Sequence, residues 1–148
     1  MIIKLQADQV GIFWESIKYS MIQANKIPKE LEQDFGNKML EKALTGLIQC
    51  WMVYKEGDSG KEVVALLTTR IIDNTDHGFK VLLLSTLSSF RLLTEELVSD
   101  AYNALEAYAL ANECSMLMAE TSIDRVKDMA IKNGFEPVFT TLRRYIGR

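Results

Sequence analysis

The sequence contains only two cysteines, two prolines and eight glycines among its 148 residues. So few cysteines exclude a small disulfide scaffold, and so few glycines and prolines exclude a collagen-like or low-complexity chain. Cys50 and Cys114 lie far apart inside apolar runs. We therefore predict that both are buried free thiols, with a disulfide between them as the alternative.

The chain also lacks an excess of basic residues, since 17 Lys and Arg stand against 20 Asp and Glu, for a net charge of −3. Nucleic acids and anionic membranes attract basic surfaces, so we predict neither as a partner. No apolar run approaches the roughly 20 residues of a membrane span, and the first residues do not form a secretory signal. We expect a cytoplasmic protein with a single domain over residues 1–148.

The spacing of apolar residues predicts most of the secondary structure. It indicates a strand at 2–5, a helix capped by Asp8, and a second helix that Pro28 opens and Gly46 ends. Three mostly apolar strands follow at 48–55, 63–72 and 79–85, which is typical of central strands covered on both faces.

The second half of the chain predicts a long helix capped by Thr94, with its buried side formed by residues such as Leu97 and Leu105. A strand at 115–120 and a helix at 123–132, capped by Thr121 or Ser122 and ended by Gly134, come next. A last strand or bent hairpin arm is expected at 135–146. We predict an α/β (α+β) fold, with a mixed central sheet and helices on both faces.

This element order, β-α-α-β-β-β-α-β-α-β, resembles that of the GNAT superfamily of N-acetyltransferases. Residues 132–138, with the sequence KNGFEPV, are similar to the "KxGFxPV" segment in which that family's last helix ends. The resemblance implies a mostly antiparallel sheet that binds acetyl-CoA in a V-shaped opening between the fourth and fifth strands. It also implies transfer of the acetyl group to an amine.

The family's pyrophosphate loop, R/Q-x-x-G-x-G/A, is not matched, because residues 85–96 contain no glycine. Glu95 and Glu96 stand in the first turn of the helix, where they either stabilise the helix start or oppose an incoming anion. By the resemblance, acetyl-CoA would be held by main-chain groups of the fourth strand and of the following loop. The Arg91 side chain and the backbone amides of Ser88 and Ser89 would form an anion nest. These cofactor-binding candidates are Leu84, Ser85, Thr86, Ser88, Ser89 and Arg91.

A second family pattern, N-x-x-A-x-x-x-Y-x-K-x-G-F, is matched only at its lysine, Lys132. Ala130 occupies the tyrosine position and Ile123 the asparagine position, so neither side chain can donate a hydrogen bond. The resemblance leaves Glu120, at the end of the fifth strand, as the catalytic candidate. If buried, its carboxylate could accept the amine proton through water; the alternative is a solvent-facing glutamate that pairs with Arg125.

Three functions stay open from the sequence: a divergent N-acyltransferase with an unknown amine acceptor, a non-catalytic module that binds a protein partner, and a small-ligand sensor. His77, the only histidine, lies in a polar turn with no second metal ligand near it, so we predict no metal site. Residues 140–146 alternate as an edge strand does, and such a strand could pair across the axis of a homodimer.

Overall fold

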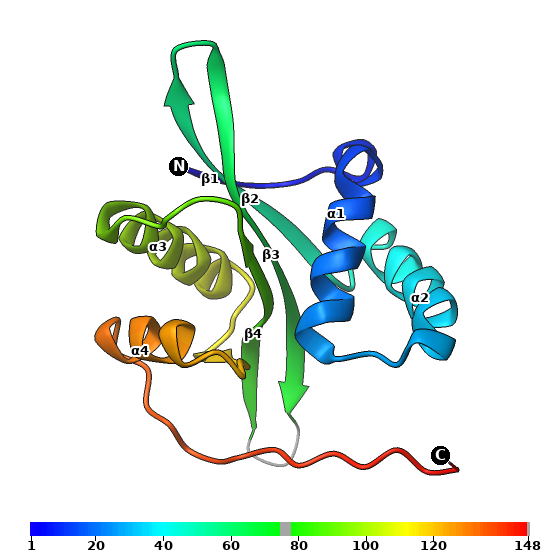
Figure 1. The fold of residues 1–148 in the computed structure, drawn as a ribbon. Helices are drawn as coiled ribbons and strands as arrows, with labels where there is room; N and C mark the ends of the chain where they lie inside the picture. Colours follow the sequence, from blue (N-terminus) through cyan, green and yellow to red (C-terminus); the bar gives the residue numbers. More distant parts are fainter. Residues whose placement is uncertain (75–77, 148) are drawn as a thin grey trace.

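The computed structural model describes residues 1–74 and 78–147, so the predicted turn around His77 lies outside the described residues. Its core is a five-stranded sheet in the order β1-β2-β3-β4-β5 (Figure 1). The first four strands are antiparallel neighbours, whereas β4 and β5 are parallel. The predicted fold class is thereby confirmed. The strands are β1 (Ile2–Lys4), β2 (Gln49–Gly57), β3 (Gly60–Asn74), β4 (Phe79–Ser89) and β5 (Met116–Ala119).

Helices cover both faces of the sheet (Figure 1): α1 (Ala7–Asn25) and α2 (Glu32–Leu44) one face, α3 (Glu95–Ala111) and α4 (Asp124–Lys132) the other. The alternation of side chains along β2 divides the core accordingly. Cys50, Met52 and Tyr54 belong to the cluster that contains α1 residues, whereas Trp51 and Val53 belong to the cluster that contains α3 residues. A strand buried on both faces explains why its sequence is nearly all apolar.

Two predicted helix starts are shifted in the structure. The N-cap of α1 is Gln6 rather than Asp8, and the Gln9 side chain accepts a hydrogen bond from the Gln6 amide at 2.8 Å. Asp8 lies in the first turn, where a carboxylate still interacts favourably with the helix dipole. Pro28 caps a short 3₁₀ turn, Lys29–Leu31, and α2 begins only after that turn.

The predicted last strand at 135–146 is wrong, because residues 135–147 form no strand pairing. Two contacts hold this segment across the end of the sheet (Figure 1). At its start, the Phe135 ring packs on Tyr102, with centroids 5.3 Å apart. Near its end, Arg143 donates hydrogen bonds to the carbonyl oxygens of Asn25 and Lys26, at the C-terminus of α1.

Both cysteines are free and buried, as predicted. Burial raises the pKa of the Cys50 thiol to about 11, so this side chain is a neutral part of the core. Within the described residues, no helix combines the length and the apolar character that a membrane span needs.

Candidate functional site

The site begins where β4 and β5 separate. The two strands pair in parallel from Val81 to Leu84 and from Met116 to Ala119, and the Glu120 amide donates a last hydrogen bond to the Leu84 carbonyl at 3.2 Å. Beyond Leu84, β4 continues along β3 alone, while the chain after β5 turns into α4. The two strands therefore form an opening that starts at Leu84.

A bulge in β4 coincides with this separation. Thr69 of β3 lies opposite Leu84 and Thr68 lies opposite Thr86, so Ser85 is an extra residue in β4. A bulge bends its strand and increases the local twist. The bend is held from inside the sheet, because the buried hydroxyls of Thr68 and Thr86 are hydrogen-bonded at 2.6 Å.

The direction of the peptide groups in β4 follows from its pairing with β3. The Phe90 amide donates to the Val64 carbonyl at 2.8 Å, so its peptide group faces β3. Because peptide groups alternate along a strand, those of Ser88 also face β3, whereas those of Leu87 and Ser89 face the opening. The opening thus presents main-chain donors and acceptors on its β4 side.

A cavity of about 890 Å³ occupies the space between the end of β4, the N-terminus of α3 and α4. This volume lies within the range of small-molecule and cofactor sites. Its walls mix apolar with polar side chains. The lining residues are Leu87, Ser88, Ser89, Leu92, Leu93, Glu95, Val98, Ser99, Ile123, Arg125, Val126, Asp128, Met129, Lys132 and Asn133.

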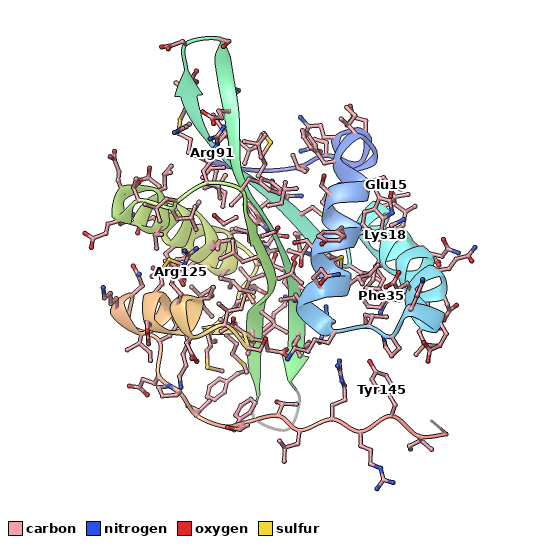
Figure 2. All side chains as sticks on the ribbon, in the orientation of Figure 1. Glu15, Lys18, Phe35, Arg91, Arg125 and Tyr145 are labelled. Carbon is pink, nitrogen blue, oxygen red and sulfur yellow. The ribbon has the colours of Figure 1, made fainter. Side chains whose placement is uncertain are left out.

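The cations of the cavity come from α4. Arg125 and Lys132 are seven residues apart, which places them on one face of a helix, and both line the cavity. Figure 2 shows Arg125 between α4 and α3. Two carboxylates, Glu95 and Asp128, line the same cavity, so its formal charges balance.

The N-terminus of α3 forms another wall. Thr94 is its N-cap, as predicted, and its hydroxyl accepts a hydrogen bond from the Leu97 amide at 3.2 Å. The free amides and the dipole of a helix start favour an anion. Glu95 and Glu96, both exposed in this first turn, offset that field.

No family model matches the sequence, and no curated protein matches it. Solved structures do match. A predicted acetyltransferase from Clostridium acetobutylicum, with acetyl-CoA, shares 12% identity over 99% of this chain and 96% of its own, at a TM-score of 0.70. The chain has the GNAT fold.

Two further acetyltransferase structures match over nearly their whole length. The ribosomal-protein-alanine N-acetyltransferase from Brucella melitensis is 13% identical over 98% of this chain and 99% of its own, with a TM-score of 0.67. An aminoglycoside acetyltransferase from an uncultured soil metagenomic sample, in complex with sisomicin, is 10% identical over 100% of this chain and 95% of its own, with a TM-score of 0.65. At such identities the likeness establishes the fold alone.

Within this GNAT fold, the six cofactor-binding candidates do not form one group. Ser88 and Ser89 line the cavity, whereas Leu84, Ser85 and Thr86 lie at the strand separation and do not. The hydroxyl of Thr86 is engaged with Thr68. The site therefore has two parts. Residues 84–86 lie at the strand separation, and the cavity that Ser88 and Ser89 line lies beyond it.

Arg91 lies away from the cavity. Its Nε is 2.8 Å from a carboxylate oxygen of Glu62, beside the protruding β2–β3 hairpin (Figure 2). The Ser89 hydroxyl donates a hydrogen bond to the Arg91 carbonyl, which turns the chain out of β4. Because Arg91 faces Glu62 and the Ser88 amide faces β3, the structure does not bring the three parts of the predicted anion nest together.

The catalytic candidate Glu120 is exposed, and among the described residues no cation pairs with its carboxylate, Arg125 included. Its amide is bonded to Leu84, so it stands at the point where the strands separate. Ile123 is the N-cap of α4, and its amide donates to the Thr121 hydroxyl at 3.1 Å. The predicted caps Thr121 and Ser122 therefore lie just outside the helix.

Two tyrosines of α3 are partly buried. Tyr108 packs edge-on against Trp51 with centroids 5.1 Å apart, and Tyr102 packs on Phe135. Burial raises the pKa of both phenols. Among the described residues, no group of three or more His, Cys, Asp or Glu side chains could hold a metal ion.

The sequence reasoning missed the role of Arg125 and Lys132 as the cations of the cavity. The signal was present, since the two residues share a helical face with Asp128 and Met129. From the sequence, Arg125 is only the alternative partner of Glu120, and Lys132 is only the matched residue of the family pattern.

Proposed function

We propose that this protein is a divergent GNAT acetyltransferase, which binds acetyl-CoA in the cavity between β4, α3 and α4 and acetylates an amine. The separation of β4 and β5 at Leu84, opening into a cavity of about 890 Å³, carries the proposal. A structure with the same fold contains acetyl-CoA, which supports the choice of ligand.

Binding would rely on the main chain and on α4. The peptide groups of Leu87 and Ser89 face the opening, where they can bond to the amides of a pantetheine arm. Arg125 and Lys132 supply the positive charge that phosphate groups require. Main-chain recognition tolerates changes of side chain, so the loop can function without the family's glycines.

The chemistry would take place where the strands separate. The amine nitrogen attacks the thioester carbonyl carbon, a C–N bond forms and the C–S bond breaks. The proton leaving the nitrogen passes to water or to the exposed Glu120 carboxylate. Ala130, at the family's tyrosine position, has no proton to give, so the departing thiolate would take its proton from water.

One observation favours a second candidate, a non-catalytic module that no longer binds CoA. Glu95 lines the cavity at the N-terminus of α3, and a carboxylate there repels a diphosphate. A sensor that binds an uncharged small ligand in the same cavity would be compatible with Glu95 as well. Binding and consumption of acetyl-CoA distinguish the proposed acetyltransferase from both of these alternatives.

Thermal unfolding with and without acetyl-CoA tests the proposal. At about 1 mM, a ligand with a dissociation constant near 10 μM adds about 2.7 kcal/mol to the free energy of unfolding, several degrees in Tm. We expect this shift in the native protein and in Lys127→Glu, because Lys127 is exposed on α4 and does not line the cavity. Arg125→Glu should abolish it.

No shift at ten times that concentration would contradict the proposal. A shift that Arg125→Glu and Lys127→Glu reduce equally would place the ligand elsewhere. Once binding is found, release of the CoA thiol in the presence of candidate amines shows whether the bound acetyl-CoA is also consumed.

A further inference from the structure

Arg70 is a charged residue in a part of the sheet that is otherwise uncharged. The segments 63–72, 81–89 and 116–119 of β3, β4 and β5 contain no other Asp, Glu, Lys, Arg or His. The Arg70 side chain is exposed, although residues 64–69 before it in β3 are all buried. Among the described residues, no carboxylate forms an ion pair with it. The sheet therefore presents an unpaired guanidinium to solvent at this position.

The strand register places Arg70 and Glu120 on one face of the sheet. Arg70 lies opposite Leu83 of β4, and Leu83 lies opposite Met118 of β5, so these three side chains share a face. The Glu120 amide continues the pairing of β5 by donating to the Leu84 carbonyl. Because side chains alternate along a strand, Glu120 lies on the same face as Met118, two residues earlier. A guanidinium and a carboxylate thus flank β4 where the strands separate.

This face is opposite to the one that carries the cavity. Leu117 packs against the core cluster that contains α3 residues, so its neighbour Met118 lies on the α1 side of the sheet. The cavity is lined by residues of α3 and α4 and lies on the other side. With acetyl-CoA in the cavity and its thioester at the strand separation, the amine has to approach from the α1 side. That side carries Arg70 and Glu120.

The two charges leave space for a small ligand between them. Neighbouring strands lie about 4.8 Å apart and successive residues about 3.3 Å, so two strand spacings and two residues separate the Cα atoms of Arg70 and Glu120 by about 12 Å. The two side chains form no ion pair with each other, and both are exposed. A molecule with an amine and a carboxylate is complementary to this pair of charges.

We propose that the acceptor is an amino acid, a small molecule that carries a carboxylate as well as the amine that is acetylated. A guanidinium binds a carboxylate through two parallel hydrogen bonds, so Arg70 would hold the carboxylate of the acceptor. Glu120 would attract its amine. The amide bond forms at the amine, the CoA thiol leaves, and the carboxylate takes no part. This inference rests on the proposed function of the same site.

Binding is measured first without turnover, in the full-length chain saturated with free CoA. Each common amino acid is compared with its amide, which keeps the amine and lacks the negative charge. At ten times its dissociation constant, an amino acid that binds should raise Tm by several degrees, and its amide should not. An amide that stabilises as strongly as its amino acid, or no stabilising amino acid at all, would overturn the proposal.

Variants locate this binding. Arg70→Gln should abolish the rise in Tm, and Arg70→Lys, which keeps the charge but not the two parallel bonds, should retain part of it. Lys127→Gln is the control, because it removes an exposed positive charge from α4, on the other side of the sheet, and should retain the full rise. A rise in Tm that survives Arg70→Gln would overturn the proposal.

Kinetics with acetyl-CoA separate binding from chemistry. Arg70→Gln should raise KM for the amino acid about 10- to 100-fold, the range expected for a lost hydrogen bond to a charged group. The same variant should change kcat little, because the carboxylate is bound alike before and during the reaction. Its KM for the amide should stay as in the native protein. A loss of kcat with an unchanged KM would overturn the assigned role of Arg70.

The two proposals fail in different ways. If acetyl-CoA neither binds nor is consumed, the proposed function fails and the acceptor class fails with it. If acetyl-CoA binds and simple alkylamines release the CoA thiol, but no amino acid is preferred to its amide, only the acceptor class is overturned.

Discussion

The guanidinium of Arg91 lies 2.8 Å from the carboxylate of Glu62, which ties the link between β4 and α3 to the β2–β3 hairpin. Lys55 approaches the same carboxylate at 3.9 Å. The cation nearest in sequence to the expected phosphate loop is thus neutralised outside the cavity. The cations that line the cavity are Arg125 and Lys132, which come from α4.

Arg91→Ala should therefore leave the affinity for acetyl-CoA unchanged. All partners of this ion pair are at least one-third exposed, so its loss should cost less than about 1 kcal/mol of stability. Calorimetric titration of the variant beside Lys132→Ala checks this, because only the latter should weaken binding. A large loss of affinity in Arg91→Ala alone would show that Arg91 leaves Glu62 to bind the ligand.

Glu95→Gln should strengthen the binding of acetyl-CoA. The change removes a negative charge from the first turn of α3, where it offsets the dipole by about 0.3–1 kcal/mol. The expected gain is therefore about two- to fivefold in the dissociation constant. Glu106→Gln, on an exposed position of the same helix, is the control and should have no effect.

Thr69→Val should destabilise the fold strongly. The buried Thr69 hydroxyl accepts a hydrogen bond from Trp51 Nε1 and donates one to Gln49 Oε1, both at 2.9 Å. Its removal leaves two buried polar groups unsatisfied, at a cost of about 2–4 kcal/mol. Urea unfolding measures the loss. Thr141→Val, at an exposed position, should change stability by less than about 0.5 kcal/mol.

Because of Cys50, the free energy of unfolding should decrease as the pH becomes alkaline. Burial raises the thiol pKa from 9.0 to about 11, so the folded state keeps a proton that the unfolded state loses. The stabilisation that the neutral Cys50 thiol gives to the folded state is complete below pH 9 and is lost as the pH rises through about 11. Between pH 8 and 10.5 the loss should be about 2 kcal/mol.

Cys50→Ala isolates this effect. The difference in unfolding free energy between the native protein and the variant should shrink by that amount over the same pH range. A difference that stays constant with pH would show that the thiol is not held neutral by its surroundings.

Strong local signals predicted much of the fold. The apolar runs of β2, β3 and β4 reflect burial on both faces, and Thr94, Gly46 and Gly134 mark helix ends through their own conformational preferences. Each of these signals acts within a few residues of the chain. These strands and helix ends can therefore be predicted without knowledge of the tertiary structure.

The errors lie where distant residues decide the outcome. The sequence predicts that β4 ends at residue 85, yet pairing with β3 extends it to Ser89. The alternation of residues 140–146 predicts a strand, but a strand needs a neighbouring edge, and the Arg143 contacts direct the segment elsewhere. Local propensity cannot anticipate such tertiary contacts.

The six cofactor-binding candidates stay a prediction. Their selection followed the position of a loop in the sequence, whereas the cavity is assembled from three elements, one of which follows β5. The pairing of Arg91 with Glu62 joins the link between β4 and α3 to β3 and has no signature in either segment.

Hydrogen exchange of the native protein with and without acetyl-CoA tests the central claim most directly, because it locates the ligand on the chain. We expect slower exchange of the amides in 87–99 and in 123–133, the two walls of the cavity, and no change in the hairpin at 55–62. Unchanged exchange in both walls would contradict the account. Protection confined to residues 4–10 and 43–50, which line a second cavity of about 240 Å³, would contradict it equally.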